Sequence, residues 1–136
     1  MKVKTSDLSG FALDFAVLLG EYLNGPPDER RFGFRQSGHG LVPRGYHPSS
    51  DPLQTYPILQ RYKIAVWPTL PEMVEAGFEE WAAICFCDKD SILGGILHLR
   101  YTEYKESFGK DILEAGLRAY IVYRFGDEVE VPEEFL

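Results

Sequence analysis

The chain has 136 residues, of which 45% are hydrophobic and 14% aromatic, so it has enough apolar material for one buried core and too much for a disordered chain. Fourteen Lys and Arg residues against 21 Asp and Glu residues give a net charge of −7, the wrong overall sign for a general nucleic-acid-binding protein. No apolar run approaches the roughly 18 residues that span a bilayer, and residues 1–10 lack the apolar segment of a secretory signal. The sequence therefore predicts one cytoplasmic domain over residues 1–136, without membrane contact.

The first predicted element is a helix over residues 9–23, where apolar side chains recur at three- and four-residue spacing and would bury one broad face. Ser9 is the predicted N-cap, because its side chain can accept a hydrogen bond from a free backbone N–H of the first turn. Residues 24–27, Asn-Gly-Pro-Pro, predict the end of this helix.

A long irregular loop is predicted over residues 25–52, which hold five glycines and five prolines. Within it, residues 31–35 alternate charged and aromatic side chains, a pattern that suits a short strand except for Gly33. Loops of this length in a compact domain are usually functional or mobile. Residues 56–62 then predict a short helix with Pro57 at its first position.

Four segments have the composition of β-strands. Residues 63–67 and 80–87 are rich in apolar side chains, and the second is so nearly continuous in them that we expect it to be central. Residues 96–104 alternate with a period of two, which predicts a strand pairing with the second segment. The acidic residues 128–132, Glu-Val-Glu-Val-Pro, have the pattern of a solvated edge strand.

The clearest element is a helix over residues 110–125 that ends at Gly126. Its apolar side chains surround the small residues Ala115, Gly116 and Ala119, which permit close approach of a neighbouring element. Glu114 and Arg118 stand four residues apart in the order that favours an intrahelical ion pair. The predicted fold class is thus α+β, with two helices packed on a small, mostly antiparallel sheet and a long glycine- and proline-rich loop.

Three separated blocks of the sequence resemble a known family. They are Lys2-Val-Lys-Thr-Ser-Asp-Leu-Ser-Gly followed by Ala12-Leu-Asp-Phe-Ala-Val; Tyr46-His-Pro-Ser-Ser-Asp with Pro57-Ile-Leu-Gln-Arg; and Leu117-Arg-Ala-Tyr with Phe125-Gly-Asp-Glu-Val-Glu-Val-Pro-Glu-Glu. In this order they resemble the NinX-like family of small phage and prophage proteins without an established activity. The chain departs from that pattern at Phe15 and Leu53, where the family commonly has Trp. The resemblance implies a cytoplasmic accessory protein made by a phage or prophage in a bacterial host cell, and it supplies no catalytic residues.

The strongest candidate binding residues lie at the end of the long loop. Tyr46, His47, Ser49 and Asp51 offer a ring, an imidazole, a hydroxyl and a carboxylate within six residues. With His39, the pair His47 and Asp51 contains residue types used for zinc binding or acid–base chemistry. The same residues also suit solvated turns, and we favour that interpretation, with no metal, cofactor or catalytic residue assigned.

A second candidate surface is basic. Residues 30–50 contain four arginines and no acidic residue, and Arg31 and Arg35 alternate with Phe32 and Phe34, a combination able to contact phosphates and stack on bases. Alternatively, this segment lies against the acidic residues 127–134, which have no cation among them.

The remaining chemically active side chains favour structural roles. Cys85 and Cys87 alternate on a predicted strand with a spacing too short for a typical zinc site, so we expect them to be buried as small apolar residues. His98 lies on an alternating strand without an evident partner.

We therefore expect a non-enzymatic module that binds a host or phage protein through the central loop and its neighbouring aromatic residues. The alternatives are a small-ligand-binding protein or small enzyme that uses the Tyr46–Asp51 segment, and a nucleic-acid-binding protein that uses the arginines.

Overall fold

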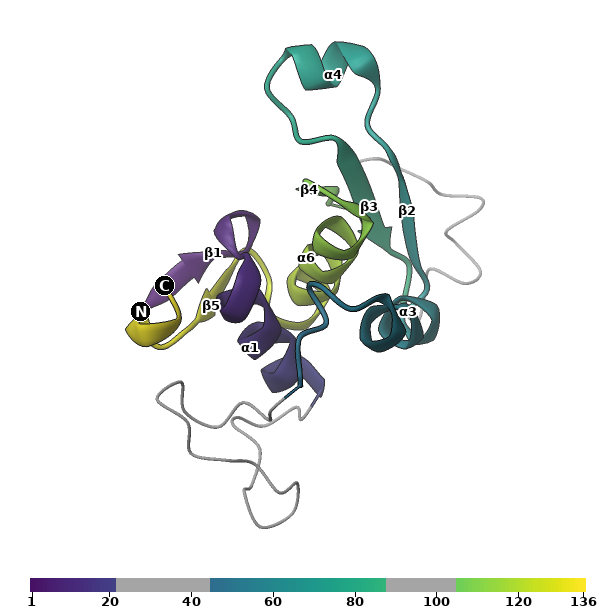
Figure 1. Ribbon diagram of the computed structural model, residues 1–136. Coiled ribbons are helices and arrows are strands. Elements are labelled where there is room, and N and C mark those ends of the chain that lie inside the picture. The colour runs from purple at the N-terminus through teal and green to yellow at the C-terminus, as the bar shows by residue number, and fades with distance from the viewer. Residues whose placement is uncertain (22–44, 88–104) are drawn as a thin grey trace.

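The computed structural model describes residues 1–21, 45–87 and 105–136, and these form the α+β fold that the sequence predicts (Figure 1). The elements in chain order are β1 (Lys2–Lys4), η1 (Thr5–Asp7), α1 (Gly10–Glu21), α3 (Pro52–Arg61), β2 (Ile64–Pro68), α4 (Pro71–Glu75), β3 (Trp81–Cys85), β4 (Ser107–Gly109), α6 (Ile112–Phe125), β5 (Glu128–Glu130) and η2 (Glu133–Phe135). Within these three ranges, no helix is long and apolar enough to cross a membrane.

Two antiparallel sheets organise the described part of the chain. The larger has the order β2-β3-β4, so the strand expected to be central lies in the middle. The second pairs β1 with β5, which places Lys2 opposite Glu130 and Lys4 opposite Glu128. The acidic tail therefore forms the expected strand, but its partner β1 was not anticipated. The predicted strand over residues 96–104 lies outside the described residues.

Helix α6 lies between α1 and the larger sheet (Figure 1). Its small residues allow the close approach expected from the sequence: Ala115 and Ala119 pack with Ala83 of β3, and a Cβ at Gly116 would meet Leu59 and Val66. On the other side, Leu117, Tyr120 and Ile121 join the main core with α1. Close packing at small residues explains why a helix with so few large side chains on one face is still fully buried there.

Helix α1 is confirmed over Gly10–Glu21, and the Leu13 N–H donates to the Ser9 carbonyl, which places Ser9 at its start. Its predicted end at residues 24–27 lies outside the described residues. The sequence predicts that this helix buries one broad face, but the structure buries every residue from Ala12 to Leu18. The C-terminal segment adds a covering layer: the ring of Phe135 stacks on Phe15 with centroids 5.0 Å apart.

Helix α3 corrects the predicted start at Pro57. It begins five residues earlier at Pro52, and Pro57 lies inside it. Asp51 is the N-cap, because its carboxylate accepts from the Leu53 N–H at 3.0 Å, and Pro52 occupies the first turn, where a missing N–H has no consequence. The sequence analysis predicts a solvated turn at Asp51, whereas the structure places this residue at the start of a helix.

Arg118 joins four parts of the fold and is only 5% exposed. Its Nε donates to the Leu8 carbonyl at 2.9 Å, and its Nη1 donates to the Phe108 carbonyl and to Glu79, both at 2.7 Å. Its Nη2 lies 3.1 Å from Glu114, which confirms the predicted intrahelical pair. The pair is buried inside the protein, where ionic groups require compensating partners.

Candidate functional site

The Tyr46–Asp51 segment is held in place by hydrogen bonds to its own neighbours. Gln54 of α3 accepts from the His47 N–H at 2.9 Å, and it donates to the Gly45 carbonyl and to the Asp51 carboxylate. Thr55 donates to the carbonyl of the fully buried Pro48. Tyr46 packs partly buried against the core. These contacts use the polar groups of the segment to build the turn that leads into α3.

Ser49 meets a carboxylate that the sequence analysis did not select. Its N–H donates to Oδ1 of Asp14 at 2.8 Å. Asp14 is 2% exposed in α1, and this burial raises the pKa of its carboxyl group, although the hydrogen bonds from Ser49 and the nearby His47 oppose the shift. An acidic residue between the apolar residues Leu13 and Phe15 was the available signal for this contact.

The structure does not join the side chains of His47, Ser49 and Asp51 in one hydrogen-bonded group. Within the described ranges, no hydrogen bond links these three side chains, because Asp51 caps α3 and Ser49 faces Asp14. Nor does any group of three or more His, Cys, Asp or Glu residues there have a geometry that could hold a metal ion. The candidates Arg31, Arg35 and His39 lie outside the described residues, as does His98.

Cations from other parts of the chain pair with the acidic tail. Lys105 lies 2.7 Å from Asp127, and the amino group of Met1 lies 2.6 Å from Glu130. The cysteines correct a further expectation, since Cys85 and Cys87 form no disulfide in the described part of the chain and are only half-buried. The Cys85 thiol donates to the Tyr62 carbonyl at 3.2 Å, so it is anchored at the end of β3.

A polar cluster closes the described end of α1. The carboxylate of Glu21 accepts from the Tyr120 hydroxyl at 2.8 Å and from the Tyr62 hydroxyl at 3.1 Å, and it pairs with Arg61 at 2.8 Å. Arg124 donates to the Tyr62 hydroxyl at 2.7 Å. Burial raises the pKa of Tyr120 well above its usual range, so its phenol stays a proton donor. The groups satisfy one another, which indicates a role in joining α1, α3 and α6.

A projection between β2 and β3, residues 69–80, carries exposed apolar side chains, and we call it the arm. Figure 1 shows its helix α4 at the far end of the β2–β3 pair, away from α1 and from the β1–β5 sheet. No residue of α4 is buried. Leu70, Val74 and Phe78 follow at intervals of four residues and are 62%, 37% and 45% exposed. Val74 lies in α4 and Leu70 is the residue before it, whereas Phe78 follows Gly77, whose φ is +103°. We call these three side chains the apolar row, for their spacing along the chain.

The arm is fixed to the rest of the protein at its base. The Thr69 N–H donates to the Glu80 carbonyl at 2.8 Å, and the Phe78 N–H donates to the Met73 carbonyl at 3.0 Å. The ring of Phe78 packs on Phe108 of β4 with centroids 4.8 Å apart. The exposed apolar row is thus presented on an ordered support, which lowers the entropy lost on binding a partner.

All charges of the arm are negative. It carries Glu72, Glu75, Glu79 and Glu80 and no Lys or Arg. The carboxylate of Glu79 is paired with Arg118 at 2.7 Å, and the structure shows no ion pair between the other three glutamates and the described residues. Sequence analysis assigned no element to residues 68–79, although apolar residues four apart after a proline are a helical signal.

Comparison of the sequence with protein-family models and with curated proteins finds no match. The functional assignment therefore rests on the residues of this chain.

Proposed function

We propose that this protein is a non-enzymatic accessory module that binds another protein through its arm. The observation that carries the proposal is the exposure of Leu70, Val74 and Phe78 on the arm, whose helix α4 has no buried residue. Contiguous apolar groups surrounded by polar ones are characteristic of protein interaction sites, whereas scattered exposed apolar residues are not. We assign to the arm the protein-binding role that the sequence analysis expects of the central loop. The reason is that polar groups at the described end of that loop form hydrogen bonds within the protein.

The charge of the arm indicates the chemistry of its partner. Glu72, Glu75 and Glu80 have no ion pair in the part of the chain that the structure describes, and the arm itself holds no Lys or Arg. A complementary surface is an apolar groove bordered by Lys and Arg, since like charges would oppose association and opposite charges accelerate it. A second copy of this chain is disfavoured as the partner because the net charge is −7.

We propose the cellular setting from the sequence resemblance alone. The opening, central and closing blocks that resemble the NinX-like family support an accessory protein of a phage or prophage, acting in the cytoplasm of a bacterial host. The partner would then be a host or phage protein.

The test is an affinity capture from host lysate that compares the wild-type protein with Leu70→Ser/Val74→Ser. The matched control is Leu53→Ser, which removes a leucine that is 84% exposed on α3. We expect one protein to be retained by the wild type and by the control, and its recovery to fall at least about tenfold with the arm variant. Glu72→Gln/Glu75→Gln should weaken capture mainly at low salt.

Three results would contradict this proposal in different ways. Equal capture by the arm variant would exclude the arm as the binding surface. Recovery that disappears after nuclease treatment would favour nucleic-acid binding through a segment that includes Arg31 and Arg35. The absence of any specific protein would overturn the binding function itself.

A further inference from the structure

Strand β2 forms one edge of the larger sheet. The sheet has the order β2-β3-β4, and no strand among the described residues pairs with the outer side of β2. Figure 1 shows β2 along this border of the sheet, between α3 and α4. The backbone groups of an edge strand are able to pair with an extended peptide from another molecule.

The direction of the β2 backbone groups follows from the hydrogen bonds at the two ends of the β2–β3 pair. The Thr69 N–H donates to the Glu80 carbonyl at 2.8 Å, and the Phe86 N–H donates to the Lys63 carbonyl at 3.0 Å. Bonded pairs alternate with unbonded pairs along an antiparallel ladder, so the odd-numbered residues of β2 are the ones that bond to β3.

The even-numbered residues of β2 therefore direct their backbone groups to the outer edge. Ile64 and Val66 each present an N–H and a carbonyl there, whereas Pro68 presents a carbonyl only. A proline at such a position costs no hydrogen bond to β3, which explains how the strand accommodates it. A peptide strand can exchange both hydrogen bonds with Ile64 and with Val66 while β2 keeps its bonds to β3.

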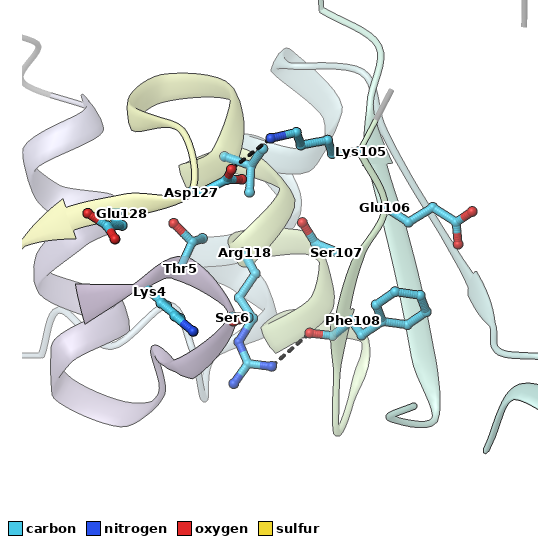
Figure 2. A pocket seen from close by; sticks show the side chains of 11 residues that line it. Lys4, Thr5, Ser6, Lys105, Glu106, Ser107, Phe108, Arg118, Asp127 and Glu128 are labelled. Carbon is cyan, nitrogen blue, oxygen red and sulfur yellow. Dashed lines mark hydrogen bonds and ion pairs between the residues drawn. The ribbon is translucent and has the colours of Figure 1, made fainter. Parts of the chain in front are cut away.

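The other edges among the described strands are protected. Phe108 of β4 lies opposite Ala82, so its carbonyl points away from β3, and Arg118 donates to it at 2.7 Å (Figure 2). The small sheet consists of Lys-Val-Lys in β1 and Glu-Val-Glu in β5, and charged side chains on edge strands oppose unwanted pairing. Strand β2 has the sequence Ile-Ala-Val-Trp-Pro, without a charged side chain, so only its terminal proline limits pairing at this edge.

Apolar side chains lie on both faces of β2 beside its open edge. Ile64 and Val66 are half-buried and pack on the side of α6, next to the small core cluster of Ala83. Ala65 and Trp67 alternate with them and so lie on the opposite face, where Ala65 is exposed. Side chains of a paired peptide would contact those of β2 on each face, so apolar residues suit every position of its central part.

The charges at the two ends of β2 favour one direction of the peptide. Lys63 is exposed just before the strand, and Glu72 and Glu75 are exposed on α4 just after it. The neighbouring strand pairs of this sheet are antiparallel, and a peptide added in the same manner begins beside α4 and ends beside Lys63. Basic residues at its start and an acidic residue at its end are complementary to these charges.

We propose that β2 binds an extended peptide segment of a partner protein by antiparallel pairing along its open edge. The segment begins with basic residues, continues with apolar residues and ends with an acidic one. Its backbone bonds to Ile64 and Val66 supply affinity, and its contacts with the apolar side chains of β2 supply specificity. The site is separate from the apolar row of the arm, and its function does not depend on that of the arm.

The experiment is a titration of the ¹⁵N-labelled protein with the peptide acetyl-Lys-Lys-Val-Thr-Val-Phe-Val-Glu-amide, followed by amide chemical shifts and hydrogen exchange. In the free protein, we expect rapid exchange at Ile64 and Val66 and slow exchange at Ala65 and Trp67, which bond to β3. Saturating peptide should slow the exchange at Ile64 and Val66 by at least about tenfold.

Methylated peptides separate backbone pairing from side-chain contact. In the proposed register the valine N–H groups face β2, so methylation of the valine nitrogens should weaken binding by at least about tenfold. Methylation of the threonine and phenylalanine nitrogens, which face away from β2, is the matched control and should leave the affinity within about twofold. The peptide Glu-Glu-Val-Thr-Val-Phe-Val-Lys, with the same blocked ends, should bind more weakly at low salt.

Two variants of the protein test the same edge. Val66→Pro removes the outward N–H and should weaken binding by about fivefold, whereas Val66→Ala keeps this N–H and should bind within about twofold of the wild type. If Val66→Pro loses the native amide spectrum, the methylated peptides decide the question with the wild-type protein.

Several results would overturn the proposal. They are unsaturable shifts, equal weakening by the two methylation patterns, unchanged exchange at Ile64 and Val66, and equal or tighter binding of the peptide with reversed charges. Protection of Ile64 and Val66 that grows with protein concentration in the absence of peptide would also overturn it, because a second copy of the chain would then occupy this edge.

Discussion

Replacing the buried guanidinium of Arg118 should be among the most damaging single changes to this fold. Arg118→Met keeps much of the apolar stem but removes every donor that reaches Leu8, Phe108, Glu79 and Glu114. The Glu114 carboxylate, in a residue only 4% exposed, would then keep the Lys110 N–H at 3.2 Å as its hydrogen-bond donor. The variant therefore leaves two carbonyl groups without their Arg118 donor and a buried carboxylate without its cation. Both effects lower the free energy of unfolding.

The expected magnitude follows from these partners. Breaking a buried ion pair by removing one member typically lowers stability by about 3–5 kcal/mol. A domain of this size has roughly 5–15 kcal/mol in total, so the variant should be marginally stable. With a urea m-value of about 2 kcal/mol/M, the unfolding midpoint should fall by about 2 M.

Urea unfolding followed by tryptophan fluorescence measures this change. Arg118→Met/Glu114→Gln should recover about 1–2 kcal/mol of the loss, because it removes the buried carboxylate while keeping its shape. Lys110→Met is the control, since the Lys110 side chain is 73% exposed and its amine lies 4.0 Å from Glu114, a surface pair worth at most about 1 kcal/mol. A loss below about 1 kcal/mol in Arg118→Met would refute the reasoning.

Three further changes test other contacts. Asp51→Ala should lower the free energy of unfolding by about 1 kcal/mol by removing the cap of α3, whereas Asp51→Ser should retain most of it; equal losses in a urea titration would exclude the cap. Burial raises the pKa of Asp14, so the folded state binds its proton more tightly, and the stability it contributes is greatest below the ordinary pKa and declines as pH rises through the raised value. Asp14→Asn should thus flatten the dependence of stability on pH above about pH 4, and an unaltered profile would contradict this assignment. Gly109→Ala would place a Cβ against the backbone of Ala115 and should lower the melting temperature through a loss of roughly 1–3 kcal/mol, with less effect for Gly116→Ala, which meets the movable end of Leu59.

Helices α1 and α6 and strands β2 and β3 were predictable because their signals are local, whereas α4 was not predicted. The apolar period and Gly126 located α6, and Gly126 adopts a φ of +88° that few other residues tolerate. The apolar run over residues 80–87 located β3, although its ordered strand ends at Cys85. The start of α3 was missed because Asp51 followed by Pro52 fits both a turn and a helix start, and only the contacts with Leu53 and Gln54 select the second.

The candidate site was less predictable than the fold. Tyr46, His47, Ser49 and Asp51 were selected for their chemistry. In the fold, the His47 and Ser49 N–H groups donate to Gln54 of α3 and to Asp14 of α1, and no pattern within residues 46–51 indicates these partners. The smaller sheet joins β1 (Lys2–Lys4) with β5 (Glu128–Glu130), strands near opposite ends of the chain. No local pattern reveals such a juxtaposition, since it depends on how strands from both ends of the chain pair.

The sequence by itself determined the α+β class, the helical faces and the spacing that pairs Glu114 with Arg118, because these depend on the period of the backbone and on neighbours within one turn. Tertiary structure alone decided that this pair is buried, that Asp14 receives Ser49, and that the arm remains uncovered. Burial and partner choice depend on which distant segments share the available apolar surface, and this is settled only when the whole core packs.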